Sequence, residues 1–302
     1  MSQLVVEERA CIGCGRCQIA CPMGVIVCGE NGIAGADETN AEVCIHCGQC
    51  VAACPAGAIS LEAPTDAELL EELADYGIDP LPARPGDQEP AEPGPFPTPE
   101  QFDSLVRARR TIRDYRVEPV GHDVIEHLVH QVLTFAPTGH NIRGLKTVVV
   151  EGRERIDQLT DLSIPYFAQL AQDPSCHSFD RKVFARIVSA WRANRIDRVF
   201  RTGHQAMFTY CSTSIPPREP AVLLNLAYFQ LAALTRGIGT AWAGYFMIVA
   251  NEPPIKQFLG VSPGESIHGA VIFGYPRWSF PRTPARPDIP LRYLSAHQEE
   301  NR

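Results

Sequence analysis

The chain has 302 residues, of which 45% are hydrophobic and 21% charged, so its composition is that of a globular protein and excludes global disorder. The length allows two domains, and the net charge of -8 argues against nucleic acid as the main partner, because phosphate binding relies on clustered basic side chains. No stretch reaches the roughly 18 apolar residues of a membrane span, and residues 1–10 lack the features of an export signal. We therefore expect a cytoplasmic protein without membrane contact, whose partner is a small molecule or another protein.

Cysteines are concentrated near the N-terminus. The chain has 11 cysteines, and eight of them fall in two similar runs, CIGCGRCQIACP at residues 11–22 and CIHCGQCVAACP at residues 44–55. Without an export signal, metal binding is favoured over disulfide formation. The repeat indicates two related halves that pack into one module.

The spacing C-x2-C-x2-C-x3-C-P resembles that of bacterial two-cluster ferredoxins. Three cysteines at this spacing can surround one face of an iron–sulfur cube, while the fourth points away and serves the other cluster. The resemblance therefore implies that each cluster draws ligands from both runs. The expected ligands are Cys11, Cys14, Cys17 and Cys54 for one [4Fe-4S] cluster, and Cys44, Cys47, Cys50 and Cys21 for the other.

Zinc is the alternative for these cysteines, because CxxC pairs also bind Zn²⁺, although structural zinc sites usually use two separated pairs. Cys28 lies outside both runs and is expected to be a small buried residue, not a ligand. His46 lies inside the second run, where four cysteines already complete the cluster. We expect it at the surface or in a role that supports the cluster.

Other elements follow from hydrophobic periodicity and from Gly and Pro signals. Residues 66–76 predict a short helix, and the proline-rich residues 80–99 predict an extended, semi-stiff linker. Residues 221–235 are apolar on nearly all faces, which predicts a helix buried on most sides. Further helices are expected around residues 102–106, 124–133 and 178–200, and strands at residues 24–27, 57–61, 146–151 and 267–275.

Helices and strands mix without a regular βαβ rhythm, so the predicted fold class is α+β. We expect a ferredoxin-like module at residues 1–62, a short helix and linker at residues 63–99, and a second domain at residues 100–302.

Residues 100–290 resemble the nitroreductase family. The resemblance rests on RARRTIRDY at residues 107–115, FAPTGHNIRGLKTVVV at 135–150, TRGIGTAWAGYF at 235–246 and GYPRWSFPRTPAR at 274–286. It implies an α+β domain that binds FMN and acts as an oxidoreductase. No GxGxxG turn joins a strand to a helix, so no separate dinucleotide-binding domain is expected.

The resemblance also assigns residues to the FMN site. Basic and hydroxyl side chains for the flavin phosphate are Arg109, Arg110, Thr111, Arg113, Arg282 and Arg286. The turn beside the isoalloxazine edge contains Pro137, Thr138 and Asn141, and the segment Trp242, Ala243 and Gly244 is expected to bring backbone N–H groups near the flavin N5. Residues 142–145 depart from the Gln-Pro-Trp-like run of many relatives, so the floor of the site is expected to differ in polarity. No catalytic residue is indicated.

The combination predicts an iron–sulfur flavoenzyme that passes electrons from two [4Fe-4S] clusters to FMN and reduces a small organic acceptor of the nitroaromatic, quinone or enone type. Ferredoxin or NAD(P)H is the expected donor. A homodimer is expected, because the FMN sites of the resembling family lie between subunits and because the helix at residues 221–235 is apolar on too many faces for one monomer to cover.

Two alternatives stay open. One is reductive dehalogenation or another specialised reaction on the same fold, and the other is a non-catalytic electron carrier or redox sensor. An open pocket lined by aromatic residues such as Tyr166, Phe167, Trp191 or Phe208 would favour the enzyme.

Overall fold

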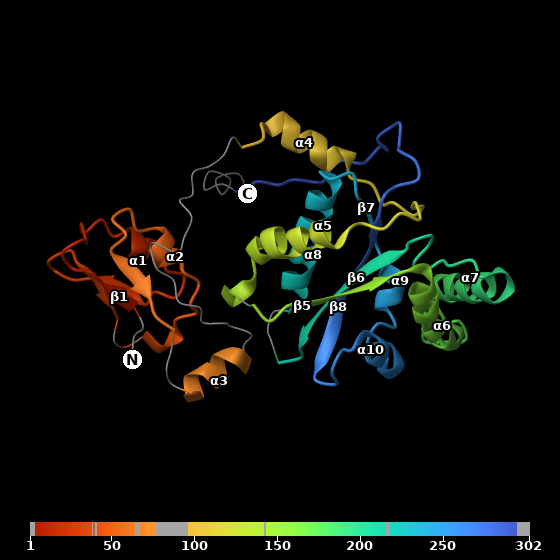
Figure 1. The fold of residues 1–302 in the computed structure, drawn as a ribbon, viewed down its shortest axis with the longest axis horizontal. Coiled ribbons are helices and arrows are strands. Elements are labelled where there is room, and N and C mark those ends of the chain that lie inside the picture. Colours follow the sequence, from red (N-terminus) through yellow and green to blue (C-terminus); the bar gives the residue numbers. More distant parts are fainter. Residues whose placement is uncertain are drawn as a thin grey trace, which may run out of the picture.

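The computed structural model describes residues 4–37, 39, 41–63, 67–75, 96–141, 143–214 and 218–294. An N-terminal module with two small sheets lies beside a larger domain built around one four-stranded sheet (Figure 1). All pairings between the described strands are antiparallel, and helices pack on the larger sheet. This mixture confirms the α+β class. Most of the predicted linker lies outside the described residues.

Two antiparallel ladders frame the N-terminal module. β1 (Leu4–Val6) pairs with β4 (Ile59–Leu61), and β2 (Ile26–Cys28) pairs with β3 (Ala34–Ala36). Because β1 precedes the first cysteine run and β4 follows the second, their pairing joins the two halves of the repeat. β2 begins later than predicted, since Gly24 takes a left-handed φ of 67°.

Each cysteine run contains one short helix, and the two helices contact each other. They are α1 (Arg16–Ala20) and α2 (Gln49–Ala52), and a 3-10 turn, Ala41–Val43, precedes the second run. α3 (Ala67–Asp75) confirms the helix predicted at residues 66–76, as far as the described residues extend.

The second domain begins with α4 (Pro99–Ala108), which starts with a capping box. Thr98 Oγ1 accepts a hydrogen bond from the Gln101 N–H at 3.3 Å, and Gln101 Oε1 accepts one from the Thr98 N–H at 2.9 Å. Pro99 occupies the first helical position, where its missing N–H is not needed. The last residue of the predicted linker therefore starts a helix.

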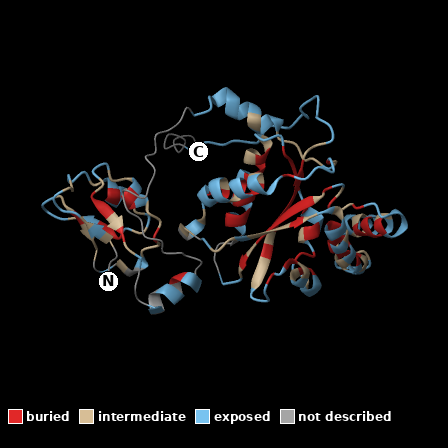
Figure 2. Cartoon of the chain, viewed as in Figure 1, coloured by how far each residue is buried: buried red, intermediate tan, exposed pale blue. Residues whose placement is uncertain are grey.

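The larger sheet has the strand order β5-β6-β8-β7. Predicted strands at residues 146–151 and 267–275 correspond to β5 (Lys146–Glu151) and β8 (Glu265–Gly274), whereas β6 (Gln205–Ser212) and β7 (Gly239–Trp242) were not predicted as strands. The central strands are buried, while the outer faces of the helices are exposed (Figure 2).

The three longest helices described in the second domain are α6 (Arg153–Leu170), α7 (Ser178–Asn194) and α8 (Arg218–Leu234). α6 was not predicted, and the helix predicted at residues 178–200 is α7, which ends because Arg195 takes a left-handed φ of 54°. In the described part of the chain, no helix is both long and apolar enough to cross a membrane. The remaining helical elements are α5 (His122–His127), a π-helical turn (Leu128–Val132), 3-10 turns (Leu133–Phe135 and Gly139–Asn141), α9 (Gly244–Met247) and α10 (Pro253–Leu259).

The helix predicted at residues 221–235 is α8, most of whose positions are buried or half-buried, but one apolar face is exposed. Leu223, Leu224 and Tyr228 are 50%, 44% and 42% exposed. Its other face packs closely on β8, where a Cβ at Gly269 would lie 2.4 Å from the Leu226 side chain. One apolar stripe of α8 therefore has no cover within the described chain.

Candidate functional site

The first set of expected ligands lines one cavity in the N-terminal module. Cys11, Cys14 and Cys17 come from the first run and Cys54 from the second. The Ala58 N–H donates to Cys54 Sγ at 3.3 Å, which helps to orient this sulfur. Cys28, expected to be a small buried residue, is only half-buried and is a fifth thiol on the wall of this cavity.

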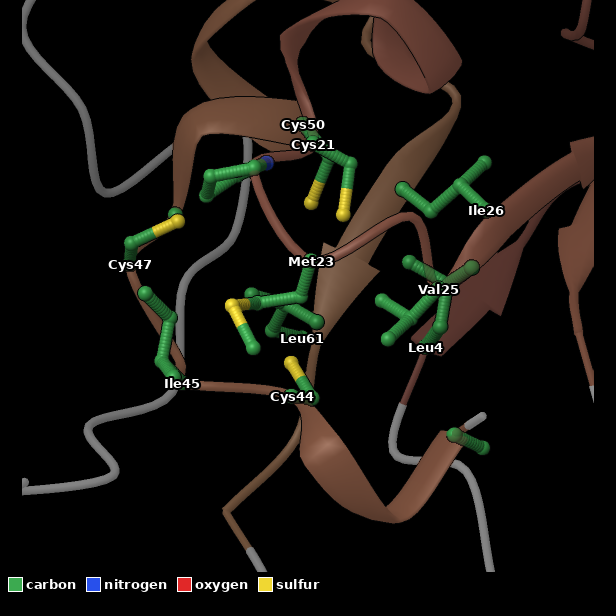
Figure 3. Close-up of a pocket in the computed structure, with 13 residues that line it drawn as sticks. Leu4, Cys21, Met23, Val25, Ile26, Cys44, Ile45, Cys47, Cys50 and Leu61 are labelled. Atoms are coloured by element: carbon green, nitrogen blue, oxygen red, sulfur yellow. The ribbon is translucent and has the colours of Figure 1, made fainter. Parts of the chain in front are cut away.

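The second set of expected ligands lines a separate cavity (Figure 3). Cys44, Cys47 and Cys50 come from the second run, Cys21 comes from the first, and their sulfur atoms point inward. Apolar side chains, including Met23, line the rest of the wall. The structure thus brings both sets together in the crossed pattern that the ferredoxin resemblance implies.

Left-handed backbone lets each run curl around its cavity. Gly13, Gly15 and Gly48 have φ between 67° and 70°. The residue that matches Gly13 in the second run is His46, whose φ is 48°. A residue with a Cβ adopts this conformation at a cost of about 1 kcal/mol. His46 is only 7% exposed, so it does not lie at the surface.

The surroundings of three of these thiols disfavour the charged thiolate form. Burial raises the pKa of Cys17 and Cys44, and it raises the pKa of Cys50 to about 12. Hydrogen bonds from the backbone N–H groups of Ala34 and Gly13 lower the pKa of Cys11. A buried thiol ionises readily only beside positive charge, which iron supplies. The number and chemistry of the sulfur atoms in each cavity fit an iron–sulfur cluster, and in the second cavity the sulfur atoms also point inward.

In the second domain, two segments that were predicted to form the flavin site lie side by side. The Ile112 N–H donates to the Thr240 carbonyl at 2.9 Å, and Thr111 forms a parallel bridge with Thr240. Gly239 permits this approach, because a Cβ there would lie 2.5 Å from the Ile112 side chain. Residues 109–113 therefore follow β7.

The segment Trp242, Ala243 and Gly244 at the end of β7 matches the predicted flavin contact only in part. Trp242 is 38% exposed, and Gly244 begins α9. The Ala243 N–H, however, donates to the Ala270 carbonyl at 2.9 Å within the sheet. Because this N–H is already used, it is not available to a flavin N5. Only Trp242 and Gly244 remain as predicted flavin contacts.

The loop before β6 adds Arg198 and Arg201, two arginines that were not predicted to belong to the flavin site. Burial and then repulsion from Arg113 and Arg198 lower the pKa of Arg201, so both of these arginines lie within electrostatic range of Arg201. The Tyr245 phenol, which follows Gly244 in the chain, also acts on Arg201. Nε of Arg198 is buried, and it has no hydrogen-bond partner among the described residues. This positive region suits an anionic ligand.

Asp197 holds this loop in place. Its Oδ1 accepts hydrogen bonds from the N–H groups of Val199 and Phe200 at 2.7 and 2.8 Å. Its Oδ2 accepts from Arg153 Nη2 at 2.5 Å and from the Thr160 hydroxyl at 3.0 Å. An Asp that turns the chain before an apolar strand was the one signal in the sequence that could have indicated this loop.

A groove of about 710 Å³ lies beside the C-terminal segment. Arg110 and Arg282, two of the residues expected at the flavin phosphate, line it together with Arg116 and Arg277. Nε of Arg110 is buried and has no hydrogen-bond partner in the part of the chain that the structure describes. The other expected phosphate residues, Arg109, Thr111, Arg113 and Arg286, are not among the residues that line this groove.

The turn that contains Pro137, Thr138 and Asn141 lies between the 3-10 turn at Leu133–Phe135 and β5. Pro137 is exposed and Thr138 half-buried, and Thr138 lines a hollow with Arg143. Asn141 hydrogen-bonds to the N-terminal module: its Nδ2 donates to the carbonyls of Ile45 and His46. The structure thus connects this turn to the loop of the second cysteine set.

The aromatic side chains that were expected to line a substrate pocket are core residues. Phe167, Trp191 and Phe208 are buried, and Tyr166 packs against the same core. The aromatic residues beside the arginine-lined groove are instead Trp278 and Phe280, whose ring centroids are 4.6 Å apart.

Comparison with known families assigns both parts of the chain. Residues 106–275 match the nitroreductase family, and residues 10–58 match the 4Fe-4S dicluster domain. A curated relative, the 4-nitrobenzoate reductase of Nocardioides sp. (strain LMS-CY), is 23% identical over 209 residues, which cover 60% of this chain and 82% of the relative.

Solved structures share the fold of the second domain. A nitroreductase with bound FMN from Desulfitobacterium hafniense DCB-2 matches 64% of this chain and 97% of its own, with 19% identity and a TM-score of 0.51. An FMN-dependent nitroreductase from Clostridium difficile R20291 matches 64% of this chain and 99% of its own, with 14% identity and a TM-score of 0.50.

Proposed function

The chain belongs to the nitroreductase family and carries a 4Fe-4S dicluster domain, and from this premise we propose that it is an iron–sulfur flavin oxidoreductase that reduces a small organic acceptor by two electrons. One observation carries the proposal. A single chain joins two cysteine-lined cavities to a domain whose groove is lined by Arg110, Arg116, Arg277 and Arg282.

Each cavity is proposed to hold one [4Fe-4S] cluster. Cys54 completes the first set and Cys21 the second, so neither half of the repeat holds a cluster alone. When bound, the clusters carry single electrons and FMN combines them for a two-electron reduction.

The FMN site is proposed to use the arginines of the second domain. Arg110 and Arg282 face one groove, which suits the dianionic phosphate. Arg201, together with Arg113 and Arg198, stabilises negative charge elsewhere on the ligand, and the partial burial of Arg198 and Arg201 strengthens their electrostatic interactions. The buried, unpartnered Nε atoms of Arg110 and Arg198 support this assignment within the described residues. Further proposed contacts are Arg109, Thr111, Pro137, Thr138, Asn141, Trp242, Gly244 and Arg286.

A nitroaromatic is the substrate class with the best support, because a 4-nitrobenzoate reductase is among the relatives. The positive region attracts an acceptor that carries a carboxylate. We propose a one-electron protein donor of the ferredoxin type, and a cytoplasmic reaction, where cysteine ligands stay reduced.

The proposal is tested with anaerobically purified protein that contains iron and FMN. Reduced ferredoxin should drive reduction of 4-nitrobenzoate, and nitrobenzene, the uncharged match, should react more slowly. Reduction of the flavin without turnover of nitroaromatic, quinone or enone acceptors would instead identify an electron carrier and contradict the proposal.

We also propose that the protein is a homodimer, because α8 leaves the apolar side chains of Leu223, Leu224 and Tyr228 exposed. Replacing Leu224 by Glu should raise the dimer dissociation constant by about 100-fold, since a charge would be buried in an apolar interface. Sedimentation across a dilution series measures this. Ile19→Glu, which changes an 88% exposed side chain in the N-terminal module, is the matched control. A wild-type protein that is monomeric at every concentration would contradict the proposal.

A further inference from the structure

Asn141 of the second domain contacts the loop between Cys44 and Cys47. Asn141 Nδ2 donates to the Ile45 carbonyl at 3.3 Å and to the His46 carbonyl at 3.4 Å. Cys44, Ile45 and Cys47 all line the second cavity (Figure 3), so the contact lies at the wall of this cavity. Asn141 has a φ of 55°, a left-handed conformation that asparagine adopts more readily than most residues.

The internal repeat provides a comparison within the same molecule. Ile12 and Gly13 of the first run match Ile45 and His46 of the second. Ile12 is 68% exposed, whereas Ile45 is partly buried. Cys14 is exposed as well, and within the described residues no hydrogen bond links the wall of the first cavity to residues 96–294. In the second cavity this side of the wall contacts the flavin domain. The corresponding side of the first cavity is therefore open to a protein partner in solution.

His46 departs from the repeat in a way that backbone geometry does not require. Glycine takes this left-handed conformation in the first run without strain, whereas the histidine adopts it at a cost. Its side chain is buried, and its Nδ1 has no hydrogen-bond partner among the described residues. A strained, buried polar residue beside an interdomain contact points to a role for the side chain at that contact.

We propose that His46 and Asn141 are positioning residues that dock the second cysteine loop on the flavin domain, so that the cluster of the second set, not the first, passes electrons to the flavin. This inference rests on the proposed function. A ferredoxin-type donor would give up one electron at a time at the exposed first cavity. Two such electrons, with two protons from water, complete the reduction of one FMN.

Hydrogen–deuterium exchange of the full chain tests the docking. His46→Gly keeps the backbone conformation of the first run and removes the side chain, and Asn141→Asp keeps the size of the side chain but removes its donor. Both variants should raise exchange in residues 44–50 by about tenfold, because Asn141→Asp loses the two donated hydrogen bonds and His46→Gly loses the packing of the buried side chain beside them. Ser214→Ala is the matched control, because it removes the hydrogen bond from Ser214 Oγ to the Asp75 carbonyl of α3, a contact of the second domain away from the cysteines. Unchanged exchange in both variants would overturn the inference.

Stopped-flow absorbance tests the order of electron transfer in the same proteins, with iron and FMN content measured first. In His46→Gly, flavin reduction by reduced ferredoxin should slow by a factor similar to the change in exchange, while cluster reduction keeps its rate. Slowing of cluster reduction with an unchanged step to flavin would overturn the inference. A wild-type protein whose clusters are reduced but never pass electrons to the flavin would contradict the proposed function itself.

Discussion

Replacing Cys54 by serine should remove the cluster of the first set, although Cys54 belongs to the second cysteine run. The protein should then contain about four irons per chain instead of about eight. The reason is geometric, because Cys54 shares a cavity with Cys11, Cys14 and Cys17, while the remaining cysteines of its own run face the other cavity. Iron and acid-labile sulfide analysis after anaerobic reconstitution measures the change.

Cys176→Ser is the control for this experiment, since Cys176 lies in the second domain and should leave the iron content unchanged. Cys21→Ser should give the mirror result and remove the cluster of the second set. Loss of the same cluster in Cys54→Ser and Cys47→Ser, detected by their spectra, would show that each run binds its own cluster and that the crossed assignment is wrong.

Replacing Arg201 by Gln should weaken FMN binding by about 10-fold to 100-fold, because a charge-assisted hydrogen bond contributes about 1.5–3 kcal/mol. Arg201 is partly buried, within electrostatic range of Arg113 and Arg198. Because few water molecules reach this position, water does not make up for the stabilisation of the anion that is lost with the charge. Fluorescence titration of the apoprotein with FMN measures the affinity.

Arg192→Gln provides the matched control, because Arg192 is an exposed residue of α7. The affinity of the wild-type protein should also fall with rising salt, since screening weakens the attraction between FMN and the arginines. Equal FMN affinity for Arg201→Gln and Arg192→Gln would place the flavin away from the loop before β6.

The sequence predicted those parts of the site that depend on local spacing. Cysteines at fixed intervals curl around a cavity because left-handed residues such as Gly13 and Gly48 recur with them. Strand β5 and helix α8 were also visible, because their apolar patterns are continuous along the chain.

Features that depend on contacts between distant residues were not predictable in the same way. Arg113 comes within electrostatic range of Arg201 only after β6 and β7 enter one sheet, and no sequence spacing encodes that arrangement. An apolar face of α8 that one monomer does not cover was expected, but the pattern alone does not state that this face contains Leu224. The contact of Asn141 with His46 joins residues 95 apart in the sequence and follows from domain packing alone.

The central claim is that the clusters deliver electrons to the flavin domain, and removal of residues 1–62 tests it most directly. The part that remains should fold, because the Desulfitobacterium hafniense nitroreductase, matched over 97% of its length by 64% of this chain, consists of that domain alone. Rates of 4-nitrobenzoate reduction should be measured for the full and truncated proteins with reduced ferredoxin and with a small chemical reductant. We expect the truncated protein to retain FMN and the chemically driven rate but to lose the ferredoxin-driven rate. Equal ferredoxin-driven rates in the two proteins would contradict it.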